Sequence, residues 1–170
     1  MDFRRTTIAD LAADVRSGRT RARDLVEVAL ARIEEVDQRV NAFVAVDADG
    51  AREQADAVDA RVAAGEDVGP LAGIPLGVKD LEDAAGFRTT QGSAAHADAG
   101  PAAADSPLVE RLRAAGCVVV GKTNTPELGH KADTTNPLFG STRNPWNLER
   151  SAGGSSGGSA AAIAAGMVPL

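Results

Sequence analysis

Residues 105–124 read Asp-Ser-Pro-Leu-Val-Glu-Arg-Leu-Arg-Ala-Ala-Gly-Cys-Val-Val-Val-Gly-Lys-Thr-Asn and indicate the class of fold. Leu108, Leu112 and Ala115 recur at helical spacing, and Asp105 is the expected N-terminal cap. Residues 117–120 are wholly apolar, which is typical of a strand that is buried on both faces. A helix followed directly by such a strand is a unit of an α/β sheet. The stretch therefore predicts an α/β protein.

The segments on the N-terminal side fit the same class. Strands are predicted over residues 42–46 and 74–80, the second ending in the charged pair Lys79-Asp80. Short helices are predicted over residues 8–15 and 51–64, and Gly65 ends the second. Between them, an amphipathic helix of about 15 to 18 residues is predicted from apolar positions at steps of three and four. These positions are Leu25, Ala29, Ile33, Val36 and Val40.

The segments on the C-terminal side are less regular. Residues 125–152 carry turn pairs without a hydrophobic period, so we expect mostly irregular chain there. Residues 153–159 read Gly-Gly-Ser-Ser-Gly-Gly-Ser, and a helix is expected over residues 160–165. The last five residues, Gly-Met-Val-Pro-Leu, resemble the opening of a buried strand rather than the polar end of a domain. We therefore expect the sequence to be part of a longer protein.

Composition excludes several classes of function. The 170 residues are 44% hydrophobic and are enough for one domain with a core. A net charge of −6, with four Phe, one Trp and no Tyr, argues against nucleic acid as a direct ligand. No apolar run is long enough to span a membrane, and no secretory signal is evident. Because the single Cys117 cannot form an internal disulfide, we expect a cytoplasmic protein.

Three partial motifs are rejected on their context. Residues 116–123 have the spacing of a phosphate-binding P-loop, but the residues between the two glycines are the predicted strand. Residues 153–157 fit the nucleophile elbow of an α/β-hydrolase, but residues 147–152 do not read as the strand that must precede it. His96 and His130 lack the spacing of metal ligands, so we expect no metal site at either residue.

The residues best suited to a chemical role are Lys79 and the Gly/Ser run, residues 153–159. Lys79 follows an apolar strand, and burial there would lower its pKa and supply a neutral amine as a base. The alternative is a strand-end lysine that reaches solvent or pairs with Asp80 or Glu82. A Gly-rich turn before a helix presents free N–H groups that bind an anion or hold a serine hydroxyl. The alternative, a flexible linker, fits poorly because an apolar helix follows immediately.

Four blocks of sequence together resemble the amidase signature family. They are residues 73–80 (Gly-Ile-Pro-Leu-Gly-Val-Lys-Asp), 121–127 (Gly-Lys-Thr-Asn-Thr-Pro-Glu), 136–146 (with Asn-Pro-Leu-Phe-Gly and Arg-Asn-Pro-Trp) and 153–162. The resemblance runs from about Leu71 to the C-terminus, and residues 20–25 are similar to the usual lead-in. It implies an α/β/α fold with a large mixed sheet covered by helices on both faces. Residues 1–70 are then a helical lead-in, and residues 71–170 begin the catalytic core.

The same resemblance implies a Ser–cis-Ser–Lys catalytic triad. By position, Lys79 matches the lysine and Ser155 the cis-serine, which implies a cis peptide bond between Gly154 and Ser155. The family's nucleophilic serine lies about two dozen residues further on, beyond Leu170, so we expect the chain alone to be inactive. Ser156 is a neighbour of the cis-serine, and Ser159 is expected to cap the last helix.

The resemblance also indicates where substrate binds. The loop of residues 127–131 would run along the acyl-binding pocket, with the backbone of Gly129 nearest to the substrate. His130 and Lys131 would tune specificity, or they would simply belong to a solvated loop.

The resemblance implies an amidase that hydrolyses a carboxylic amide through a serine acyl-enzyme, with no metal or organic cofactor. Two alternatives stay open: a glutamine-hydrolysing amidotransferase subunit of the same family, and an anion-binding or interaction domain without catalysis. Residues 125–131 and the Asn-Pro-Trp block look more like those of stand-alone amidases. The expected partner is a small-molecule amide, with no nucleic acid and no membrane. Whether the full-length protein forms a homodimer is left open.

Overall fold

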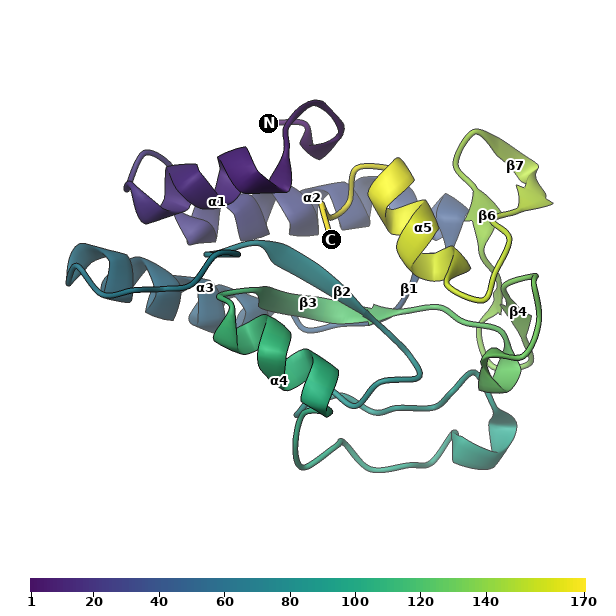
Figure 1. The fold of residues 1–170 in the computed structure, drawn as a ribbon. Helices are drawn as coiled ribbons and strands as arrows, with labels where there is room; N and C mark the ends of the chain where they lie inside the picture. The colour runs from purple at the N-terminus through teal and green to yellow at the C-terminus, as the bar shows by residue number, and fades with distance from the viewer.

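The computed structural model describes residues 1–170 and contains a mixed three-stranded sheet (Figure 1). The strand order is β1-β3-β2, with β3 (Val118–Thr123) in the middle. β1 (Phe43–Val46) runs antiparallel to β3, and β2 (Pro75–Lys79) runs parallel to it. The connection from β2 to β3 contains α4 (Pro107–Ala114). The helix and strand predicted from residues 105–124 are therefore confirmed.

Helices cover the sheet on both sides (Figure 1). α1 (Ile8–Arg16), α2 (Ala22–Val40) and α5 (Gly157–Ala164) lie above it in this view, and α4 lies below. α3 (Ala48–Ala63) packs against both α2 and β3. This arrangement confirms the predicted α/β fold, a mixed sheet with helices on both faces.

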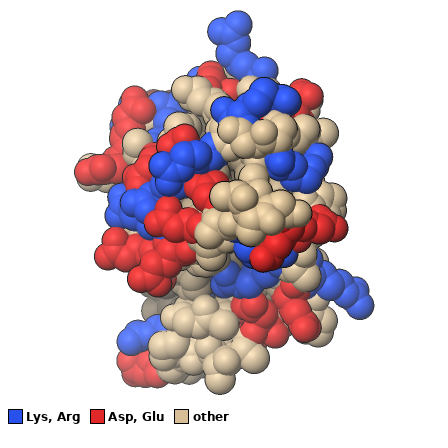
Figure 2. All heavy atoms as spheres, turned by 90° about the vertical axis from the view of Figure 1, so that its left-hand side faces the viewer, with Lys and Arg blue, Asp and Glu red and all other residues tan.

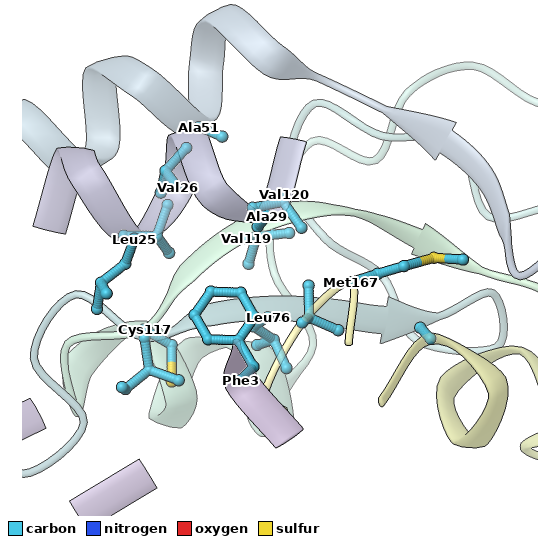
Figure 3. Packing of buried hydrophobic residues seen from close by; sticks show 14 of the residues in the cluster. Phe3, Leu25, Val26, Ala29, Ala51, Leu76, Cys117, Val119, Val120 and Met167 are labelled. Atoms are coloured by element: carbon cyan, nitrogen blue, oxygen red, sulfur yellow. The ribbon is translucent and has the colours of Figure 1, made fainter. Parts of the chain in front are cut away.

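A single cluster of 33 buried hydrophobic residues forms the core. The apolar stripe predicted on α2 is buried along its whole length. Figure 3 shows Phe3 and Met167, from opposite ends of the chain, packed near the strand residues Leu76 and Val119. Cys117 belongs to the same cluster, and burial raises the pKa of its thiol to about 12. Both ends of the chain thus help to close one core.

The predicted elements of the first eighty residues are confirmed, with one shifted boundary. The helix over 8–15 and the strands over 42–46 and 74–80 match α1, β1 and β2 to within one residue at each end. α3 begins at Ala48 rather than at residue 51. The reason is its cap, because the Asp47 carboxylate accepts a hydrogen bond from the backbone N–H of Gly50.

The boundaries of α4 and β3 also differ from prediction. Ser106 rather than Asp105 is the N-cap of α4, with Pro107 in the first turn. Asp105 instead pairs with Arg113 at 2.9 Å. β3 continues to Thr123 instead of ending at residue 120. The strand therefore carries Lys122, a charged residue that the apolar pattern did not include.

The expectation of mostly irregular chain over residues 125–152 is wrong in part. β4 (Thr135–Asn136) pairs with β5 (Gly140–Ser141), and β6 (Arg143–Asn144) pairs with β7 (Asn147–Ser151). These two antiparallel hairpins consist of short strands, and every residue of β7 is exposed. Strands of this kind have no alternating apolar pattern from which they can be predicted.

The last residues of the chain lie beside β2. Met167 and Val168 are buried, and the backbone N–H of Gly77 donates to the carbonyl of Leu170 at 3.1 Å.

None of the helices combines the length and apolar character of a membrane span. On the face drawn in Figure 2, positive and negative side chains are interspersed.

Candidate active site

The contact between Lys79 and Ser155 defines the candidate site. Lys79 is the last residue of β2, after four buried positions, and its own side chain is half-buried. Its Nζ donates to Ser155 Oγ at 2.7 Å and to Ser156 Oγ at 3.0 Å. These residues are 76 and 77 positions apart in the chain. The fold therefore brings together the two residues that the sequence singled out.

Lys79 forms no ion pair with Asp80 or Glu82, the alternative that the sequence left open. The Asp80 carboxylate pairs with Lys122, and the Glu82 carboxylate accepts from Ser106. Desolvation at the strand end lowers the pKa of Lys79 below its ordinary value. An amine with hydroxyl partners and a lowered pKa is suited to exchanging protons with those hydroxyls.

The Gly/Ser run forms a tight turn that leads into α5. The peptide bond between Gly154 and Ser155 is cis, as the resemblance implies. α5 begins at Gly157 rather than at residue 160. The prediction that Ser159 caps this helix is wrong, since Ser159 lies inside α5 and its hydroxyl bonds to Thr123 Oγ1 at 2.7 Å. Ser156 occupies the N-cap position.

A close approach of backbones explains a glycine at the start of α5. The N–H of Gly158 donates to the carbonyl of Asn124 at 3.2 Å. A Cβ atom on Gly158 would lie 2.3 Å from the backbone nitrogen of Asn124. The first turn of α5 can therefore pack on the end of β3 only without a side chain at this position.

Buried polar residues at the end of β3 and directly after it support the turn, and sequence reasoning missed them. Thr123, Asn124 and Thr125 are each 0% exposed. The Asn136 side chain donates to Asn124 Oδ1 at 2.6 Å and to the Thr125 carbonyl at 2.7 Å. Thr125 Oγ1 in turn donates to the carbonyl of Ser155 at 3.4 Å. The available signal was a run of polar residues directly after a fully apolar strand.

Lys122 and Asp80 form a second buried feature near the site. Their side chains are 0% and 1% exposed, and Lys122 Nζ lies 3.1 Å from Asp80 Oδ1. Lys122 Nζ also donates to the Arg88 carbonyl and to Thr89 Oγ1. Burial lowers the pKa of Lys122, while the Asp80 charge opposes this effect. The pair ties the loop after β2 to the middle strand.

The predicted substrate-binding residue Gly129 lies in a short 3-10 turn (Glu127–Gly129). Its φ of 69° lies in the left-handed region, and a Cβ there would lie 2.6 Å from Leu81 Cδ1. The other end of the loop approaches the Gly/Ser turn, because a Cβ atom on Gly154 would lie 3.0 Å from the carbonyl oxygen of Lys131. The loop of residues 127–131 therefore connects the region of Leu81 with this turn. A contact between Gly129 and substrate stays a prediction.

The two histidines lie away from these contacts. His96 ends a 3-10 turn (Ala94–His96), and its Nδ1 is buried without a hydrogen-bond partner. His130 is exposed, and its Nδ1 lies 2.6 Å from the carbonyl of Glu127. Neither residue contacts Lys79 or Ser155 through a hydrogen bond.

The structure tests the reasons for rejecting two motifs. Residues 118–121, which lie between Gly116 and Lys122, belong to strand β3, so they cannot cradle a phosphate as a P-loop does. The statement that no strand precedes the Gly/Ser run is wrong, because β7 ends at Ser151. β7 is an exposed hairpin strand, however, whereas a nucleophile elbow follows a strand of the central sheet.

A family model described as Amidase matches residues 24–170. The chain belongs to the amidase family. It is 49% identical over 169 residues to a glutamyl-tRNA(Gln) amidotransferase subunit of Salinispora arenicola, a match that covers 99% of this chain and 34% of that protein. It is also 49% identical over 161 residues to AtzE, a 1-carboxybiuret hydrolase subunit of Pseudomonas sp., covering 95% of this chain and 35% of that protein.

A solved structure extends the match to the fold. A bacterial aryl acylamidase, described as an amidase signature enzyme, aligns with a TM-score of 0.90 and 39% identity. The alignment covers 96% of this chain and 34% of that one. The chain thus spans about a third of the length of the curated relatives that it matches. Hydrolase and amidotransferase relatives match this chain at the same identity.

Proposed function

We propose that the whole protein hydrolyses a carboxylic amide, with Lys79 as the base and Ser155 as the proton relay. The observation that carries this proposal is the 2.7 Å contact between Lys79 Nζ and Ser155 Oγ. The contact joins a strand end to a glycine-rich turn, and both belong to sequence blocks that resemble the family. Membership of the amidase family supports the type of bond that is broken.

The proposed mechanism begins with proton transfer. Neutral Lys79 accepts the proton of Ser155 Oγ, while Ser155 accepts a proton from the nucleophilic serine, which we place beyond residue 170. The serine oxygen attacks the amide carbon, and the C–N bond breaks to leave an acyl-enzyme. The protonated relay returns its proton to the leaving nitrogen. Water then hydrolyses the ester by the same route in reverse.

The lowered pKa of Lys79 supports its role as the base. An exposed lysine at neutral pH is almost entirely protonated and cannot accept a proton. Desolvation at the end of β2 favours the neutral amine. The Ser155 and Ser156 hydroxyls solvate the amine without adding a negative charge that would restore the ammonium form.

Substitution of the two residues tests the proposal. In the whole protein, Lys79→Ala and Ser155→Ala should each abolish hydrolysis of a simple amide while circular dichroism and thermal unfolding show an intact fold. Full activity in either variant would exclude the proposed roles. A binding module without catalysis would have no turnover to lose.

The 170-residue chain provides a second test. Because the proposed nucleophile lies outside it, the purified chain should show no hydrolysis of aryl or aliphatic amides. Measurable turnover by this chain would contradict the proposed assignment of the nucleophile.

A glutamine-hydrolysing amidotransferase is the second candidate, favoured by the 49% identity to the glutamyl-tRNA(Gln) amidotransferase protein of Salinispora arenicola. It would release ammonia from glutamine for a partner subunit. Comparing glutamine with simple amides as substrates of the whole protein, and identifying any protein that co-purifies with it, would separate the two candidates.

A further inference from the structure

Thr134 is a buried polar residue to which the proposed mechanism gives no role. It lies directly before β4, in the segment that follows the predicted substrate loop. Its side chain is 0% exposed. Burying a hydroxyl costs free energy unless it is hydrogen-bonded, so the hydrogen-bond partners of Thr134 indicate its structural role.

Two of the three polar atoms of Thr134 contact the Gly/Ser run. Its Oγ1 donates to the carbonyl of Gly153 at 2.7 Å and accepts from the N–H of Gly157 at 3.1 Å. Its own backbone N–H also donates to the Gly153 carbonyl, at 2.9 Å. Gly153 and Gly157 stand two positions before and two positions after Ser155. One hydroxyl therefore bridges the two ends of the turn that presents Ser155.

Two other hydrogen bonds to the backbone of this turn are longer than those of Thr134 Oγ1. The N–H of Gly153 donates to the exposed Ser151 hydroxyl at 3.2 Å, and the Ser155 carbonyl accepts from Thr125 at the long distance of 3.4 Å. Glycine at position 157 is matched to the bridge, because a Cβ there would lie 2.2 Å from Thr134 Oγ1. The close fit of the threonine hydroxyl and the glycine points to a specific contact.

We infer that Thr134 is a positioning residue, whose hydroxyl clamps Gly153 and Gly157 so that Ser155 Oγ stays within hydrogen-bond distance of Lys79 Nζ. The inference rests on the proposed function, in which Ser155 relays a proton to Lys79. Proton transfer requires the heavy atoms to be within hydrogen-bond reach, and a displacement of about 1 Å can cost about 100-fold in rate. Thr134 does not itself touch the reacting atoms.

Three variants of the whole protein test the inference. Thr134→Val removes the hydroxyl and keeps the shape, whereas Thr134→Ser keeps the hydroxyl. Thr142→Val is the matched control, because Thr142 is also 0% exposed and its Oγ1 donates to the Asn41 carbonyl and accepts from Asn124. Thr142 Oγ1 makes no hydrogen bond to the Gly/Ser run.

We expect Thr134→Val to lower kcat on a simple amide by about 30- to 100-fold, while KM changes by about twofold or less. Thr134→Ser should recover most of the lost kcat. Thr142→Val should lower the melting temperature about as much as Thr134→Val does. It should leave kcat near that of the wild-type protein. Wild-type kcat in Thr134→Val, no rescue by serine, or an equal loss of kcat in Thr142→Val would each overturn the inference.

A crystal structure of Thr134→Val separates this inference from the proposed function. We expect the Lys79 Nζ to Ser155 Oγ distance to exceed about 3.5 Å, beyond hydrogen-bond reach, or the turn to adopt more than one conformation, whatever the activity of the parent. An unchanged contact would overturn the inference even if the protein is an amidase. If Thr134→Val cannot be purified in folded form, Gly157→Ala carries the same test, since its Cβ would displace the Thr134 hydroxyl.

Discussion

Lys79 and Lys122 lie on neighbouring strands and have opposite surroundings. Lys79 ends β2 opposite Thr123, one residue beyond Lys122 on β3. Lys122 is 0% exposed and is paired with the Asp80 carboxylate, whereas Lys79 is half-buried and bonds to two serine hydroxyls. The two residues thus differ most in the charge of their partners.

In the proposed mechanism, this difference separates a structural lysine from the base. Desolvation lowers the pKa of both lysines, but only for Lys122 does a carboxylate oppose the effect. A buried ammonium is stable when it is paired and fully hydrogen-bonded. Lys79 has no such charge to hold its proton. The deeper lysine therefore supports the fold, and the shallower one is available for chemistry.

The largest expected effect is on turnover by the Lys79 variant. Lys79→Met in the whole protein should lower kcat by about 10⁴-fold, because general-base catalysis is lost. Its free energy of unfolding, measured with urea, should change by about 1 kcal/mol or less, since the side chain is half-exposed and has no ion pair. A large loss of stability would mean that Lys79 is structural like Lys122.

Replacement of Lys122 should act in the opposite way. Lys122→Met leaves the Asp80 carboxylate buried without its counter-ion, and we expect a loss of about 3 to 5 kcal/mol in the free energy of unfolding. The double variant Asp80→Asn/Lys122→Met should recover much of this loss because no uncompensated charge remains. Urea denaturation measures both. Equal stability of the single and double variants would contradict a buried ion pair.

The pH dependence of turnover sharpens the same contrast. The proposed mechanism needs neutral Lys79, so kcat/KM should rise with pH by about tenfold per unit below the pKa of this residue. Since desolvation lowers that pKa, the rise should level off below the ordinary lysine value of about 10.4. A rate that is independent of pH between about 6 and 9, with the enzyme stable throughout, would argue against an amine base.

The smallest effect is expected at the third lysine. Lys131 is exposed, and no hydrogen bond or ion pair of its side chain is found. Lys131→Ala should change the free energy of unfolding by about 0.5 kcal/mol or less. Comparing kcat/KM for neutral and acidic amides would show whether this side chain contributes to specificity. A stability loss comparable with that of Lys122→Met would overturn the ordering of the three lysines.

Local patterns predicted most of the framework correctly. The apolar stripe of α2 and the apolar run of β3 were readable because each reflects the repeat of its own element. The β4–β5 and β6–β7 hairpins were missed because short exposed strands carry no such repeat. The cap of α4 was assigned to the wrong residue, since the Asp105 carboxylate accepts a hydrogen bond from the backbone N–H of Ala85 and lies in an ion pair with Arg113.

Some features of the candidate site were likewise predictable from local sequence patterns, and others were not. Lys79 and Ser155 were found from motifs in which residue type and spacing are visible along the chain, and glycines beside Ser155 indicated a tight backbone. The sequence offered Asp80 as a partner for Lys79, and nothing in it connected Thr134 with Gly153 and Gly157. Hydrogen bonds between residues far apart in the chain arise only when the sheet and helices have packed, because burial then leaves each polar group a few partners within reach. Local repeats and motifs thus indicate the class of fold and the candidate site residues, whereas packing decides which partners Lys79, Lys122 and the Thr134 hydroxyl have.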